Sequence, residues 1–167
     1  MKKDKKELYF WKRHFNIKNN NLDSIPTEVN RFNFRHSEVD DEWLLYITSR
    51  IKVIHQLDLD ETLITDKGIY FLTKLETIKE LRLKGCRDIS KECLNDLNQI
   101  KSLELLHLGG TSIDLDDLYK LSALQSLKLI LVSSSDNIAV IKEKVSALKH
   151  FFPLCIINVN HQIWDSN

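Results

Sequence analysis

The chain has 167 residues, of which 43% are apolar and 29% are charged. This length and composition predict one folded domain with a substantial core, and they exclude a disordered chain. The 24 basic and 24 acidic side chains balance to a formal net charge of zero. That balance argues against nucleic-acid binding, which depends on an excess of basic side chains that neutralise phosphates.

The N-terminal segment is basic and aromatic. Residues 1–13 hold six basic side chains against two acidic ones, and Leu8, Tyr9, Phe10, Trp11 and Phe15 lie among and just after them. We expect residues 1–28 to form an N-terminal cap, with a helix that covers the end of the fold and an asparagine-rich loop over 16–27. The alternative is a peripheral membrane-binding helix, since an apolar face with basic neighbours also suits an anionic lipid surface.

Location is predicted from what the sequence lacks. The basic start is not followed by the apolar run of a secretory signal, and no stretch approaches the ~20 apolar residues of a membrane span. Three cysteines, Cys86, Cys93 and Cys155, form no disulfide framework. We therefore expect reduced thiols and a cytoplasmic location.

A recurring pattern fills residues 29–132. Two apolar residues separated by one residue are followed by another apolar residue, most clearly in Leu57-Asp58-Leu59 with Ile64 and in Leu106-His107-Leu108 with Ile113. The copies start at 32, 57, 81, 106 and 127, and the first four are 24 or 25 residues apart. This period is typical of leucine-rich repeats. It predicts an α/β fold: a short horseshoe solenoid of about five repeats, with a parallel sheet on the concave face and helices on the convex face.

Each repeat should continue into a helix that begins at a capping residue. The candidate caps are Asp66 in the second repeat and Ser90 in the third, while the first and fourth helices follow the pairs Asp40 and Asp41, and Asp114 and Asp116. Beyond the repeats, Asp136 should cap a helix that runs to about Lys149, and residues 154–159 should form a final strand. These two elements make a C-terminal cap over 133–160, and residues 161–167, with Trp164, are expected to be a polar tail.

The third copy carries a family resemblance. Leu83-Lys84-Gly85-Cys86-Arg87-Asp88-Ile89-Ser90-Lys91-Glu92-Cys93-Leu94 resembles the cysteine-containing subtype of leucine-rich repeats, and Ile64-Thr65-Asp66-Lys67-Gly68-Ile69 has the helix opening of that subtype. With its Pro153-Leu154-Cys155-Ile156 ending, the chain is also similar to the family of mitochondrial ATP synthase coupling factor B (subunit s). The resemblance implies the repeat fold, cysteines that face the core, and a non-catalytic role in binding or assembly.

The candidate binding surface is the concave face. The residues between the paired leucines should form a middle row across the sheet, made of Asn33, Asp58, Arg82, His107 and Lys128. The next row adds Arg35, Asp60 and Lys84. Mixed charges of this kind suit a protein partner with the complementary pattern. The predicted function is therefore non-catalytic protein binding without a cofactor, either as an immunity protein (antitoxin) or as an assembly factor.

An enzyme or a metal-binding protein that uses the same face is the alternative. The metal form would use Asp58, Asp60 and His107, and the enzyme form would pair Cys86 or Cys93 with His107. A guanidinium separates Asp58 from His107 in the predicted row and would repel a divalent cation. A core thiol is inert because the thiolate is the reactive species. Both observations favour the binding function.

Overall fold

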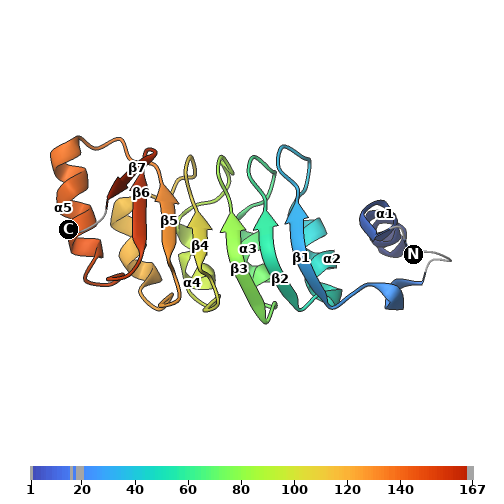
Figure 1. Cartoon of the computed structure of the whole chain (residues 1–167). Coiled ribbons are helices and arrows are strands. Elements are labelled where there is room, and N and C mark those ends of the chain that lie inside the picture. The colour runs from blue at the N-terminus through green and yellow to red at the C-terminus, as the bar shows by residue number, and fades with distance from the viewer. Residues whose placement is uncertain (1, 16, 18–20, 165–167) are drawn as a thin grey trace.

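The computed structural model describes residues 2–15, 17 and 21–164. These residues form an α/β structure with a seven-stranded sheet, whose strands follow one another in chain order (Figure 1). Strands β1 to β6 run parallel, and β7 is antiparallel to β6. The predicted α/β class with a parallel sheet is confirmed.

The elements are short and alternate along the chain. The strands are β1 (Glu28–Asn33), β2 (Val53–Asp58), β3 (Thr77–Arg82), β4 (Leu105–His107), β5 (Leu129–Val132), β6 (Ile156–Val159) and β7 (Gln162–Trp164). The α-helices are α1 (Lys2–Phe15), α2 (Asp41–Arg50), α3 (Asp66–Leu72), α4 (Leu94–Leu97) and α5 (Ile138–Leu148). Three 3-10 helices are η1 (Leu22–Ser24), η2 (Lys91–Cys93) and η3 (Leu115–Leu121).

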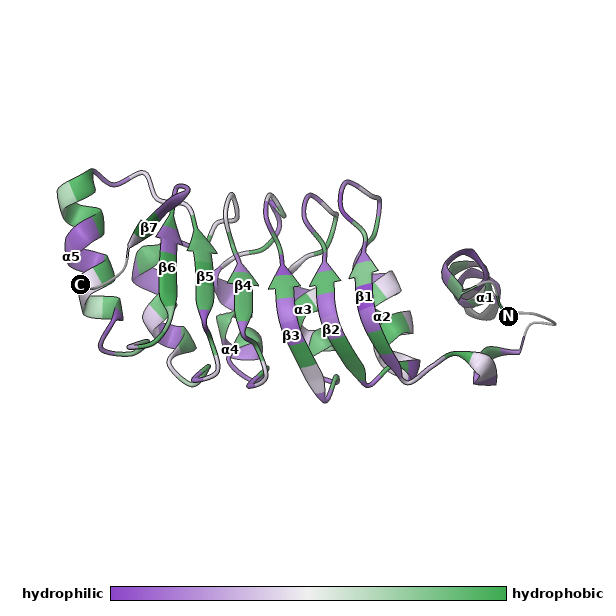
Figure 2. Cartoon of the chain, viewed as in Figure 1, coloured by the Kyte–Doolittle hydropathy of each residue, from purple (hydrophilic) through white to green (hydrophobic). Residues whose placement is uncertain are grey.

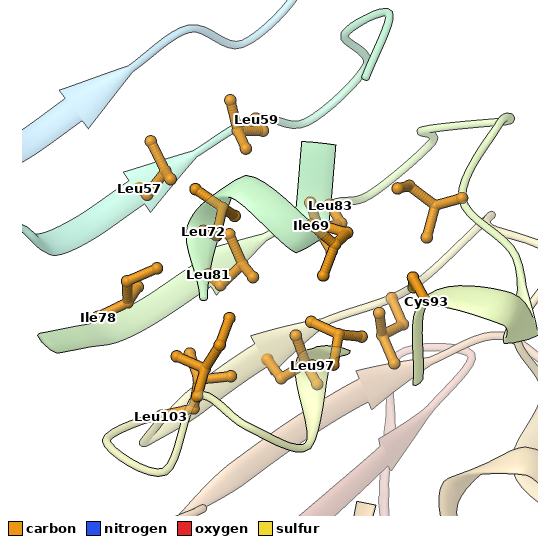
Figure 3. Close-up of a cluster of buried hydrophobic side chains, with 14 of the residues drawn as sticks. Leu57, Leu59, Ile69, Leu72, Ile78, Leu81, Leu83, Cys93, Leu97 and Leu103 are labelled. Atoms are coloured by element: carbon orange, nitrogen blue, oxygen red, sulfur yellow. The ribbon is translucent and has the colours of Figure 1, made fainter. Parts of the chain in front are cut away.

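Three apolar positions around each of the strands β2 to β5 point into the core. In the second unit they are Ile54, Leu57 and Leu59, all of which are buried. The register of the sheet places the middle position of every unit in one row: Phe32, Leu57, Leu81, Leu106, Ile130 and Ile157. Leu57 and Leu81 belong to the same buried cluster as Ile69 and Leu72 of α3 (Figure 3). Each such side chain contributes about 1.5–3 kcal/mol by leaving water.

The helix starts are joined by a ladder of carboxylates. The Asp41 carboxylate accepts hydrogen bonds from the backbone N–H and the hydroxyl of Thr65, at 2.9 and 2.8 Å. Asp66 accepts the same two bonds from Ser90, at 2.7 and 2.6 Å. In the third unit Lys91 stands at the position of Asp41 and Asp66, so the ladder ends there. These bonds fix the angle between successive helices.

The predicted cap of helix α3, Asp66, is wrong. Thr65, not Asp66, is the N-cap residue of α3, because the Thr65 hydroxyl accepts from the N–H of Lys67. Asp66 is the first helical residue, and its carboxylate serves the next unit instead. Asp40, Ser90 and Asp114 do cap α2, η2 and η3.

Helix α1 covers the N-terminal end of the core, as its aromatic residues predict. Phe10 and Trp11 are buried, and the Phe10 ring lies 5.0 Å from Trp43 and 6.0 Å from Tyr46, between ring centroids. These side chains pack in the same cluster as Phe32 of β1, and α1 lies at the N-terminal end of the sheet in Figure 1. The Glu7 carboxylate accepts a hydrogen bond from Arg50 of α2. None of the described helices combines the length and apolar character needed to cross a membrane.

The C-terminal end differs from its prediction in two respects. Helix α5 is capped by Asn137, whose side chain accepts from the N–H of Val140, while Asp136 pairs with Lys144 at 2.7 Å. The predicted tail is wrong at its start, because Gln162–Trp164 form β7 and Trp164 packs against the core. The remainder of that tail, 165–167, and residues 16 and 18–20 of the predicted loop lie outside the described residues.

Gly68 provides a test of the ladder. A Cβ at this helical position would lie 2.5 Å from Asp41 Oδ1 and 3.0 Å from Leu44 Cδ1. In most helices glycine to alanine stabilises by up to about 1 kcal/mol, but here we expect Gly68→Ala to lower the free energy of unfolding. Urea denaturation of wild type and variant measures the sign of this change.

The control is the same substitution without the carboxylate. In an Asp41→Ala background, Gly68→Ala should cost less stability than in wild type, because the clash with Oδ1 is gone and only the contact with Leu44 remains. An equal loss of stability in both backgrounds would contradict a clash between the added methyl group and the Asp41 carboxylate.

Candidate functional site

One face of the sheet is left uncovered by the described helices. Helices α2, α3 and α4 lie behind the strands in the view of Figure 1, and the front of the sheet, which we call the open face, carries none. The predicted concave face corresponds to this surface. Its middle row, fixed by the strand register, is Asn33, Asp58, Arg82, His107, Leu131 and Asn158.

Lys128 is the predicted site residue that the structure removes from the row. It precedes β5, and its exposed amine pairs with Glu104. The phase of the fifth copy is therefore wrong: Leu127 is followed by Ile130 and Val132, the spacing that Leu103 forms with Leu106 and Leu108, and all of these are buried. The sequence Leu127-Lys128-Leu129 resembles the paired leucines of the other copies, but it lies three residues before the true pair, Ile130 and Val132.

The N-terminal half of the open face, here called the charged half, is an ionic network around a depression of about 400 Å³. The depression is lined by Arg31, Asn33, Arg35, Gln56, Leu57, Asp58, Glu80 and Arg82. The Arg35 guanidinium lies 2.7 Å from Asp60 and 3.4 Å from Asp58. It therefore bridges Asp58, at the end of β2, and Asp60, in the turn that follows.

Asp58 and Asp60 are mostly structural. Their side chains are only 7% and 2% exposed. Asp58 accepts from the backbone N–H of Asp60, and Asp60 accepts from the N–H of Lys84 at 2.8 Å. The two carboxylates therefore hold the turns at the strand ends, and the accessible charges of this half are those of Arg35, Arg82 and their exposed neighbours.

The C-terminal half of the open face, here called the apolar half, was missed by sequence reasoning. Beside Glu80 the register places Leu105, Leu129 and Ile156, and the middle row continues with Leu131. Ile163 of β7 lies opposite Asn158 and is 67% exposed. Figure 2 shows hydrophilic bands on β1, β2 and β3, whereas β5 is hydrophobic throughout. The apolar run from Leu129 to Val132 could have indicated this half, but the fifth copy was predicted to start at 127, which placed the run in the wrong register.

A small pocket of about 170 Å³ lies at the strand ends of the apolar half. It is lined by Lys84, Gly85, His107, Gly109, Gly110, Leu131, Val132, Ser133, Asn158, Asn160 and His161. His107 is 9% exposed, and burial lowers the pKa of its imidazole below the usual value. The imidazole is therefore neutral at pH 7.

The geometry gives no support to the catalytic and metal alternatives. Cys86 and Cys93 are buried, burial raises the pKa of both thiols, and the Cys86 thiol donates to the Leu59 carbonyl oxygen at 3.0 Å. Asp58 and His107 are two strands apart with Arg82 between them. Across the part of the chain that the structure describes, no three His, Cys, Asp or Glu side chains could hold a metal ion together.

Comparison with known proteins assigns no family to the chain. No protein-family model matches it, and no curated protein matches it.

Asp60→Ala should lower the free energy of unfolding by about 1–3 kcal/mol, the cost of leaving partly buried polar groups without their acceptor. The change removes the partner of the Arg35 guanidinium and of the Lys84 N–H. Urea denaturation measures the loss, with exposed Asp88→Ala as the matched control. Equal stability of the two variants would contradict a structural role for Asp60.

Stability should also fall in acid because of His107. Its pKa is lowered in the folded state, so as the pH falls below about 6.5 the unfolded state takes up the proton first and gains stability. His107→Gln removes this contribution. We expect the difference in unfolding free energy between about pH 7.5 and about pH 5.5 to be smaller in the variant than in wild type. Identical pH dependence would contradict a buried, neutral His107.

Proposed function

We propose that the chain is a leucine-rich-repeat solenoid of the cysteine-containing subtype, in which each strand from β1 to β6 opens one unit. The middle core position recurs at 32, 57, 81, 106, 130 and 157, so the steps are 25, 24, 25, 24 and 27 residues. With Ile130 instead of Leu127 as the middle core position of the fifth unit, the distance from Leu106 becomes 24 residues and matches the preceding steps. The inward-facing Cys86 and Cys93 fit this subtype.

We further propose that the protein binds another protein through the open face, without catalysis. The observation that carries this proposal is the division of the open face into an apolar half and an adjoining charged half. Contiguous apolar side chains rimmed by polar ones mark protein interfaces, because exposing apolar surface to water is unfavourable unless a partner covers it. Repeat folds in general present such extended faces to their partners.

The two halves would contribute differently to binding. Apolar contacts at Leu129, Leu131 and Ile163 would provide most of the affinity, since the burial of apolar surface drives association. The accessible charges of Arg35 and Arg82 would set the register of the partner and speed its approach. An immunity protein or an assembly factor both fit this division of labour, and an assembly role agrees with the resemblance to the coupling factor B family.

The test targets the apolar half at its most exposed point. Ile163→Lys and Leu129→Lys should each weaken partner binding at least tenfold while the protein stays folded, which corresponds to about 1.4 kcal/mol or more. Tyr119→Lys is the matched control, because Tyr119 is 52% exposed on η3, behind the sheet. Partners are captured from the host lysate, identified by mass spectrometry, and titrated by calorimetry.

Retention of the same partner by Ile163→Lys and Leu129→Lys, together with loss by Tyr119→Lys, would move the interface to the helical side. Circular dichroism and urea denaturation of each variant separate a loss of binding from a loss of fold. Growth rescue by co-expression with a neighbouring toxic protein distinguishes the immunity role from assembly.

A further inference from the structure

The pocket of the apolar half is lined by hydrogen-bond donors and by no acidic residue. Its polar side chains belong to Lys84, Ser133, Asn158, Asn160 together with the two histidines, His107 and His161. The chain as a whole has equal numbers of acidic and basic residues, so this lining differs from the average surface. Asn160 Nδ2 already donates to the Ser134 carbonyl oxygen, and Ser133 Oγ accepts from the N–H of Gly110. The groups left to meet a ligand are the Lys84 ammonium and the His107 imidazole, and a lining with a cation and no carboxylate favours an anion.

His107 presents one ring nitrogen to this pocket. Its Nδ1 is buried without a hydrogen-bond partner. Nε2 faces Gly109, where an added Cβ would lie only 3.1 Å away. In a neutral imidazole one nitrogen carries the proton, and a buried N–H without an acceptor is costly, so the proton belongs on Nε2. His107 then donates from Nε2, and glycine at 109 leaves room for an acceptor.

Lys84 supplies the positive charge. It follows β3 in an exposed position, and its backbone N–H is held by Asp60 at 2.8 Å. Lys128 and Lys144, by contrast, are paired with the carboxylates of Glu104 and Asp136. Among the described residues no carboxylate pairs with the Lys84 amine. The nearest acid that acts on His107, Asp60, is already bound to Arg35.

We infer that this pocket binds a carboxylate of an acidic residue on the partner protein, between the Lys84 ammonium and the His107 Nε2–H. One permanent cation and neutral donors match a single negative charge. A phosphate carries about 1.5 to 2 charges at pH 7 and would meet only one compensating cation here, with Asp60 close by. The volume of about 170 Å³ admits a carboxylate with little water.

This assignment rests on the proposed protein-binding function and makes it more specific. Leu131 and Val132 also line the pocket, so the acidic residue of the partner would be flanked by apolar residues that cover the apolar half. Such a charged anchor at the border of an apolar patch favours one register of the partner, because a shift by one strand would separate its carboxylate from the Lys84 ammonium.

The experiment uses small anions and needs no partner. Wild-type protein is titrated with sodium acetate and, separately, with inorganic phosphate at constant ionic strength, and NMR follows the His107 ring and the amide of Gly110. We expect saturable shifts with acetate. Lys84→Gln should weaken acetate binding about tenfold, the loss of one charge-assisted hydrogen bond, whereas Lys101→Gln, an exposed lysine elsewhere, should leave it unchanged.

Three outcomes would overturn the inference. They are the absence of saturable acetate shifts, equal binding by wild type and Lys84→Gln, and tighter binding of phosphate than of acetate. Because the anion titration and the Ile163→Lys capture are independent, a failure of the pocket leaves the protein-binding proposal standing. Amide spectra of both lysine variants verify that the fold is unchanged.

Discussion

No unit of this chain can bury its apolar face alone. The row from Phe32 to Ile157 exists only because the register of the sheet brings one residue from every unit to the same depth. Each strand is three to six residues long, too short to be stable without neighbours. The spacing of units, the straight order of strands and the uncovered front of the sheet all follow from this shared burial.

The ends of such a stack need separate solutions. At the N-terminus, aromatic side chains of α1 cover the first unit, and the Glu7–Arg50 pair anchors the helix to α2. At the C-terminus, α5 and the antiparallel β7 close the sheet, and Trp164 covers part of the last core layer. Aromatic residues serve both ends because one ring covers a large apolar area at a low cost in side-chain entropy.

The sequence predicted the α/β class and the parallel sheet, because burial at a fixed period leaves a regular trace. The prediction failed where the same residues fit the repeat pattern in two different registers. Leu127, Leu129 and Ile130 allow two phases, and only hydrogen bonding between β4 and β5 decides between them. The N-cap residues are Thr65 and Asn137, each one position from the predicted Asp66 and Asp136. The sequence does not fix at which of two neighbouring residues the helical backbone begins. The burial of Asp58 and Asp60 could not be foreseen, because it depends on Arg35, some 25 residues earlier in the chain.

The carboxylate ladder has a consequence for how the molecule would come apart. Asp41 and Asp66 tie the first three units together, and Lys91 interrupts the series before the fourth. In linear arrays, cooperativity is set by the coupling between neighbours, so a weaker coupling divides the array into segments that open at different free energies. The interruption falls close to the border between the charged and apolar halves. The apolar half thus lies on the side of the structure where the Asp41–Asp66 ladder does not continue.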